Sequence, residues 1–153
     1  MFTSEELMKV MRVDGIRHRI VPFHPRHLHM AEFRDVDQEI IDGYGRPHIE
    51  DYSVDGLGYT VFGIYPLWKG VAEAWMLPSK ELSDIKLQFH KSALRFFRYA
   101  PAKLKLHRLQ TYVRSTNYRA IRWMESCYFK REGLLRNYGP DIKDYYAYGR
   151  LYQ

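Results

Sequence analysis

The residues from Arg108 to Gly133 constrain the fold more strongly than any other stretch of the chain. Polar and apolar residues alternate from Arg108 to Val113, which is typical of a half-buried strand. A short run of capping side chains ending at Asn117 then interrupts the alternation. The apolar residues that follow share one face of a helix: Ala120, Ile121, Met124, Cys127 and Tyr128. The stretch predicts a strand, a capped turn, a helix and a new strand from Gly133, and the free amides of that helix favour an anionic ligand.

Length and composition limit the class of protein. The chain has 153 residues, 46% of them hydrophobic, which is enough for one domain with a sizeable core. No apolar run approaches the ~20 residues of a membrane-spanning helix, so no membrane partner is expected. The start, MFTSEELMKVM, lacks the apolar centre of a secretory signal. The single cysteine, Cys127, fits a reducing cytoplasm.

The net charge of +6 is compatible with an acidic partner. A solvated basic surface explains this charge more simply than a dedicated nucleic-acid interface does. Nucleic-acid binding is therefore the weakest of the function classes that we consider.

The N-terminal residues predict a short helix. Thr3 and Glu6 have the spacing of a capping box, and Asp14-Gly15 would end the helix. We expect residues 1–15 to form a helical appendage to a domain at residues 16–153. Such a helix can dock on its own domain or on a second copy, as in a homodimer, and the sequence leaves both open.

The rest of the chain is typical of one mixed α/β domain with a central sheet of about seven strands. Strands are expected at 16–23, 48–54, 57–65, 71–77, 108–113, 133–138 and 144–152. Helices are expected at 24–33, at 35–41, and from Ser79 or Ser83 to Arg98, followed by a loop at 99–105. Asp55-Gly56 indicates a two-residue hairpin turn.

Three histidines invite a metal-binding interpretation. His24 and His27 fit one helical face, but His29 points elsewhere, and no cysteine or carboxylate pair lies near them. We therefore expect no metal site.

Two short patterns resemble a known family. Asn117-x-x-Ala120 followed by Phe129 resembles the helix motif of the GNAT superfamily of acyl-CoA N-acyltransferases. The phrase GIYPLWKGVAEAWML is closest in pattern to small GNAT-like proteins of tailed phages. The order of elements from residue 16 to 152 resembles that family too, which implies a mostly antiparallel sheet flanked by helices.

Three features depart from the family pattern. Met124 stands where a tyrosine is common, and Tyr128 stands where a glycine is common. The segment from Pro78 to Asp84, which corresponds to the family's pyrophosphate loop, contains no glycine. Without glycine the backbone approaches a ligand less closely.

The resemblance implies transfer of an acetyl group from acetyl-CoA to an unknown amine, on a protein or a small molecule, by direct attack. It implies a cytoplasmic enzyme, in the host cytoplasm if phage-encoded. The residues that it assigns to acetyl-CoA are Trp75, Met76, Leu77, Lys80, Ser83, Asn117 and Ala120. It assigns the general base to Glu73. The candidates for a replacement acid are Tyr112, Tyr128 and Tyr138, and of these we select Tyr128.

Each assignment has a simpler alternative. Asn117 can be a helix cap and no more, and Glu73 can be an ordinary strand glutamate in a salt bridge. The missing glycines and the missing tyrosine also fit a non-catalytic GNAT-like phage protein, internal to the virion or interacting with the host.

Overall fold

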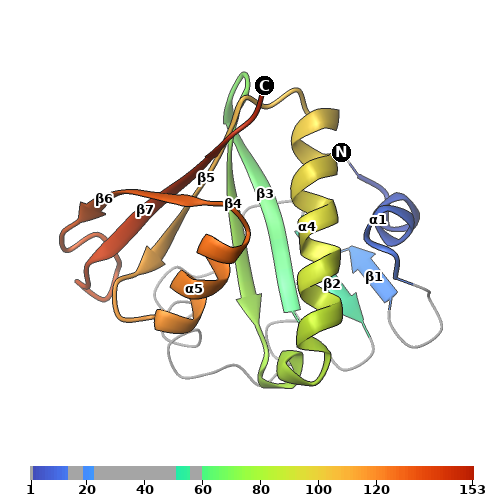
Figure 1. Cartoon of the computed structure of the whole chain (residues 1–153), viewed down its shortest axis with the longest axis horizontal. Coiled ribbons are helices and arrows are strands. Elements are labelled where there is room, and N and C mark those ends of the chain that lie inside the picture. The colour runs from blue at the N-terminus through green and yellow to red at the C-terminus, as the bar shows by residue number, and fades with distance from the viewer. Residues whose placement is uncertain (1, 14–18, 23–50, 56–59) are drawn as a thin grey trace.

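The computed structural model describes residues 2–13, 19–22, 51–55 and 60–153. The helices expected at 24–33 and 35–41, and the three histidines, lie outside the described residues. The elements, in chain order, are α1 Ser4–Met11, β1 Arg19–Pro22, β2 Asp51–Asp55, β3 Thr60–Trp68, β4 Val71–Pro78, the 3-10 helix η1 Lys80–Ile85, α4 Lys86–Lys103, β5 Arg108–Arg114, α5 Tyr118–Ser126, β6 Lys130–Leu135 and β7 Tyr145–Leu151 (Figure 1).

The strands form one seven-stranded sheet in the order β1-β2-β3-β4-β5-β7-β6. Every neighbouring pair is antiparallel except β4 and β5, which are parallel. A parallel pair needs a crossover connection, and here α4 supplies it. The predicted mixed α/β fold, with its mostly antiparallel sheet, is confirmed.

The parallel pair β4/β5 separates partway along its length. The two strands pair only from Val71↔Arg108 to Glu73↔Gln110. Beyond Glu73, β4 continues to Pro78 and stays paired with β3 alone. Figure 1 shows β4 and β5 diverging toward their C-terminal ends. One edge of the second half of β4 therefore has no strand partner in the sheet.

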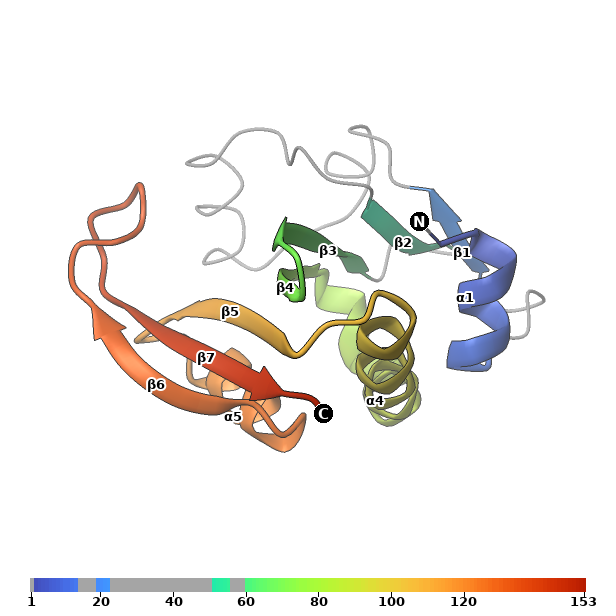
Figure 2. The same cartoon turned by 90° about the horizontal axis from the view of Figure 1, so that it is seen from above.

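The helices α4 and α5 cover the same face of the sheet (Figure 2). Phe89, Ala93 and Phe96 share one face of α4 and are buried. On β5, the alternating residues Leu109, Thr111 and Val113 are also buried. The buried residues of β5 and of α4 thus belong to one core, in which the aromatic rings of α4 predominate.

The helix α1 packs against α4 and β1 and contributes Leu7 and Met11 to the same core, which Phe2, just before the helix, also joins. Its predicted capping box is present: Glu6 N donates to Thr3 Oγ1 at 3.0 Å, and Thr3 N donates to the Glu6 carboxylate at 3.4 Å. Whether residues 1–15 and 16–153 behave as separate units stays a prediction.

The boundaries of α4 differ from the prediction at both ends. Neither Ser79 nor Ser83 caps an α-helix, because residues Lys80–Ile85 form the 3-10 helix η1. At the other end α4 continues through Pro101 to Lys103, where a loop was expected. Proline costs a helix its backbone hydrogen bond, but burial of Phe97, Ala100 and Pro101 offsets that cost.

Three local predictions in the remaining strands and in α5 were wrong. β2 runs to Asp55, β3 begins at Thr60, and Val54 pairs with Thr60, so the two strands are not joined by a two-residue turn at Asp55-Gly56. β6 spans Lys130–Leu135 instead of 133–138, because this edge strand is almost wholly exposed and lacks alternation. Tyr128 does not share the buried face of α5: it lies past the end of the helix, 67% exposed, with φ at 68°.

Candidate functional site

The point where β4 and β5 separate brings together the groups that the sequence analysis singled out. Glu73 is the last residue of β4 that pairs with β5, and its partner is Gln110. The next residues of the two strands, Ala74 and Thr111, line a common cavity. Strand ends that diverge within a sheet leave backbone groups and side chains free to meet a ligand.

The cavity has a volume of about 50 Å³ and lies between the sheet and the helices α4 and α5. Its walls are almost entirely apolar and come from three adjacent strands and three helices. The lining residues are Met11, Phe62, Gly63, Ala74, Trp75, Met76, Phe89, Ala93, Phe96, Phe97, Thr111, Trp123 and Met124. An apolar cavity with a few polar groups is the usual form of a small-molecule site.

Two buried polar side chains lie just beyond the last β4/β5 pair, Thr111 on the cavity face of the sheet and Trp75 on the face that carries Glu73. Trp75 Nε1 is buried and has no hydrogen-bond partner, which is costly for an N–H donor. Thr111 is a buried threonine on β5, adjacent to the last β4/β5 pair. Among the described lining residues, Thr111 is the one with a side-chain hydroxyl, and Trp75 and Trp123 carry side-chain N–H groups.

Glu73 lies on the opposite face of the sheet from Ala72 and Ala74, which belong to the core under α4. It is half-buried, and the hydrogen bonds and ion pairs of the described residues include none from its carboxylate. Burial raises the pKa of Glu73. A carboxylate without a partner in a half-buried position is poised to accept a proton.

Polar and aromatic residues of β5 lie beside Glu73 on the same face. Gln110 Nε2 donates a hydrogen bond to Tyr112 Oη at 3.0 Å. The Tyr112 ring lies 5.0 Å from that of Tyr138, centroid to centroid. The pKa of Tyr112 is raised, first by burial and then by the charge of Glu73. This face therefore offers a polar, aromatic approach to the separation of β4 and β5.

The capped turn predicted after β5 is present. Asn117 is the N-cap of α5, and its side chain accepts a hydrogen bond from Ala120 N at 3.4 Å. Ala120 packs against the core. Further along α5, both Trp123 and Met124 line the cavity. Asn117 therefore fixes the start of α5, the helix that forms one wall of the cavity.

The predicted site residues fall into two groups. The cavity includes Trp75 and Met76 in its lining, and Glu73 immediately precedes it. Leu77 is buried, and its carbonyl accepts a hydrogen bond from Thr60 Oγ1 at 3.4 Å. The structure does not bring three others to the cavity: Lys80 and Ser83, both exposed on η1, and Tyr128, whose ring lies under Arg150.

Several cavity residues were missed by the sequence analysis. Met11, Phe62 and Trp123 carry no local signal beyond an ordinary apolar pattern, because they meet only through packing between distant segments. Thr111 could have been identified from the sequence, because it is the one residue with a side-chain hydroxyl on the buried face of β5.

Other chemistries find little support in the described residues. No group of three or more His, Cys, Asp or Glu there could hold a metal ion. Burial raises the pKa of the Cys127 thiol to about 11, so it is a poor nucleophile. No helix in the described part of the chain is long and apolar enough to cross a bilayer.

Comparison with known proteins bears on the fold. No protein-family model and no curated protein matches the sequence. Solved structures do match. A GNAT-family acetyltransferase from Bacillus anthracis is 16% identical, with a TM-score of 0.67 over 88% of this chain and 95% of that one.

Two further solved structures show the same likeness. Ard1 from Thermoplasma volcanium is 17% identical, with a TM-score of 0.63 over 90% of this chain and 99% of that one. A mutant of the spermidine N-acetyltransferase SpeG from Vibrio cholerae is 15% identical, with a TM-score of 0.61 over 88% of this chain and 94% of that one. At these identities the likeness is one of fold, and the fold of this chain is that of the GNAT acetyltransferases.

Proposed function

We propose that this chain is an N-acetyltransferase that moves an acetyl group from acetyl-CoA to an amine at the separation of β4 and β5. The observation that carries the proposal is the position of Glu73, an unpaired half-buried carboxylate at the last β4/β5 pair, next to an apolar cavity. Glu73 borders the gap between β4 and β5 on one face of the sheet, and the cavity borders it on the other. An amine and an acyl group can therefore meet in this gap.

Acetyl-CoA fits the chemistry of the cavity walls. The β4 residues from Ala74 to Pro78 are paired with β3 only, which leaves backbone amides and carbonyls free for the amide groups of a pantetheine arm. The unpartnered Trp75 Nε1 supplies one further donor for a carbonyl oxygen. Met76, Leu77, Asn117 and Ala120 complete the proposed contacts on the two sides of the separation.

The reaction is direct acyl transfer. The amine nitrogen attacks the thioester carbonyl carbon, a C–N bond forms, and collapse of the tetrahedral intermediate breaks the C–S bond. Glu73 accepts the proton that the amine loses, directly or through one water. Its raised pKa suits this role, because a base works best when its pKa approaches the working pH.

The leaving thiolate has no evident acid partner. Met124 stands in the cavity wall, and the described lining residues include no tyrosine. Tyr112, on the face that carries Glu73, is the tyrosine that we propose as a substitute, in place of the exposed Tyr128. The missing acid is also the observation that favours the second candidate: a non-catalytic GNAT-like protein that serves a phage virion or contacts a host protein.

A thiol-release assay tests the proposal. Purified protein is given acetyl-CoA with a panel of small amines and lysine peptides, and free CoA thiol is followed with a thiol reagent. We expect one class of amine to raise thiol release well above the amine-free rate. The Glu73→Gln variant keeps the side-chain size but cannot take the proton, so its rate should fall roughly 10²-fold.

A matched control is Glu5→Gln, the same substitution on an exposed residue of α1. It should leave the rate unchanged. If Glu73→Gln turns over within a few-fold of the parent, Glu73 is structural and another group takes the proton. If no amine is acetylated although acetyl-CoA binds, the non-catalytic candidate gains.

A further inference from the structure

The cavity has a definite direction beneath α4. Phe62 and Gly63 of β3 line one end, and Thr111 of β5 lines the other. Neighbouring strands lie about 4.8 Å apart, so residues of β3 and β5 reach this small cavity from opposite ends. Its β5 end lies at the point where β4 and β5 separate. Its β3 end is therefore the end remote from the base Glu73.

The helix α1 packs against α4 and β1 and contributes Met11 to the lining on that side of the cavity. In the described part of the chain, Met11 alone among the lining residues comes from α1, and its side chain is 2% exposed. The Met11 carbonyl accepts hydrogen bonds from Ser92 Oγ at 2.7 Å and from Arg95 Nη1 at 3.5 Å. Figure 2 shows α4 between α1 and α5, so the cavity residues of α1 and those of α5 come from opposite sides of α4.

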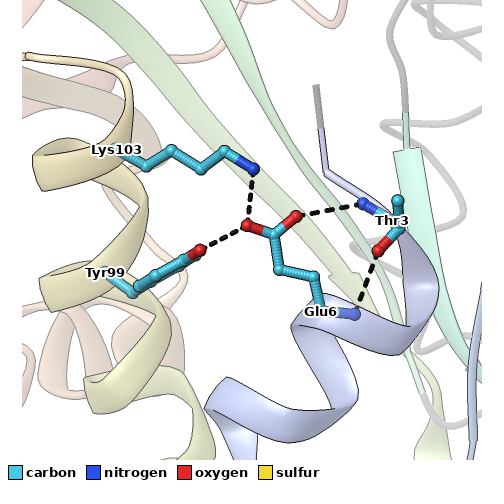
Figure 3. A network of polar contacts seen from close by, with 4 residues as sticks. All are labelled: Thr3, Glu6, Tyr99 and Lys103. Atoms are coloured by element: carbon cyan, nitrogen blue, oxygen red, sulfur yellow. Dashed lines mark hydrogen bonds and ion pairs between the residues drawn. The ribbon is translucent and has the colours of Figure 1, made fainter.

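A polar network fixes α1 against α4. The Glu6 carboxylate accepts hydrogen bonds from Tyr99 Oη and from Lys103 Nζ, and its other oxygen accepts one from Thr3 N (Figure 3). The Phe2 ring adds a contact with Phe96, at 6.3 Å between centroids. The wall that Met11 forms is thus held by bonds at both ends of α1.

The size of the cavity matches a short acyl group. A volume of about 50 Å³ is roughly a third of the ~150 Å³ cavity that admits benzene, and it holds only a few water-sized groups. The walls near Met11 are apolar side chains of Phe62 and Phe96, which favour a hydrocarbon tail over a polar group. Methionine is unbranched, so its three terminal heavy atoms occupy space that a longer tail would need.

We propose that this cavity receives the acyl chain of the acyl-CoA and that Met11 limits the chain to short groups such as acetyl. The inference rests on the proposed function and adds to it the residue that determines acyl specificity. It also makes α1 part of the substrate site. Replacing Met11 with a small residue frees about three heavy-atom positions, so the preferred chain lengthens by about two or three carbons.

Titration calorimetry with CoA, acetyl-CoA and hexanoyl-CoA tests this inference without any need for an acceptor amine. We expect the parent to bind acetyl-CoA at least tenfold more tightly than hexanoyl-CoA. In Met11→Ala that ratio should fall at least tenfold. Met11→Val is the second variant, since it leaves a smaller void and gives the same direction of change if the alanine variant does not fold.

Leu7→Ala is the matched control, because Leu7 is a fully buried residue of the same helix that does not line the cavity. It should weaken the fold and leave the ratio unchanged. If acyl-CoAs bind but Met11 variants keep the parent ratio, or Leu7→Ala shifts it equally, the acyl-specificity inference is overturned and the proposed function stands. If neither CoA nor any acyl-CoA binds, the proposed function itself fails.

Discussion

At the scale of single residues, Glu73 is the group whose surroundings matter most for the proposed chemistry. A strand glutamate on a solvent-facing sheet surface would be an ordinary acid in a salt bridge. Here the carboxylate is half-buried, and the described hydrogen bonds and ion pairs do not include it. Desolvation raises its pKa, and the same desolvation makes the ionised form costly to the fold.

The effect of pH on stability tests this burial independently of any ligand. The folded pKa of Glu73 lies above the ordinary value of 4.5, so the unfolded chain binds fewer protons and stability falls as pH rises above 4.5. Glu73→Gln removes this penalty. The variant should therefore melt above the parent at pH 7, and the gap should close as pH falls below 4.5.

Melting curves of both proteins from pH 4 to 8 provide the measurement. A gap that stays constant across this range would mean that the substitution changes packing and not ionisation. A variant that melts below the parent at pH 7 would mean that the carboxylate has a favourable partner.

Other site residues differ in how far the sequence could anticipate them. The Asn117 cap was predicted correctly, because a cap is a local hydrogen bond to Ala120 N, three residues away. Tyr128 was misplaced, because α5 ends at Ser126, two residues earlier than its apolar spacing suggested. The place of Met11 in the cavity lining was missed, since a contact between α1 and a cavity under α4 leaves no trace in local spacing.

At the scale of elements, one carboxylate, that of Glu6, serves both α1 and its contact with α4. Glu6 closes the capping box of α1 and also bonds Tyr99 and Lys103 of α4. The hydrogen bond from Lys103, followed by that from Tyr99, holds the pKa of Glu6 at about 2. The cap and the interhelical contact therefore depend on the same ionised group.

This coupling predicts a pH window for the docking of α1. The stabilisation by Glu6 is fully present above its ordinary pKa of 4.5 and is lost as pH falls toward about 2. Glu6→Gln should therefore melt below the parent at pH 7, with the deficit vanishing between pH 4.5 and 2. Glu5→Gln, the neighbouring substitution on the same turn, should show no such dependence. An equal deficit at pH 7 and pH 2.5 would contradict an ionic role for Glu6.

The element order was predictable where local patterns agree with tertiary packing. The apolar run of β4, the alternation of β5 and the stripe on α4 all gave the right elements. The passage of α4 through Pro101 could not be foreseen, because buried contacts outweigh the local preference of proline. The edge strand β6 was misjudged because an exposed strand shows no two-residue period.

At the scale of the whole molecule, the site exists only where several segments meet. Separation of β4 and β5 supplies free backbone, Glu73 supplies a half-buried carboxylate, and α1, α4 and α5 line an apolar cavity. No single segment carries this arrangement, which explains why short motifs gave only the family resemblance. The fold brings an apolar cavity and a carboxylate to one gap in the sheet, and the proposed function rests on that arrangement.

Binding of acetyl-CoA to the purified chain tests the central claim most directly. A ligand that binds only the folded state stabilises it by about 2.7 kcal/mol at a hundredfold excess over Kd, which raises the Tm of a chain of this size by roughly 5–10 °C. We predict saturable heat in titration calorimetry and a Tm that rises with acetyl-CoA concentration. No heat and no shift in Tm at millimolar acetyl-CoA would contradict the proposal that this site takes acetyl-CoA.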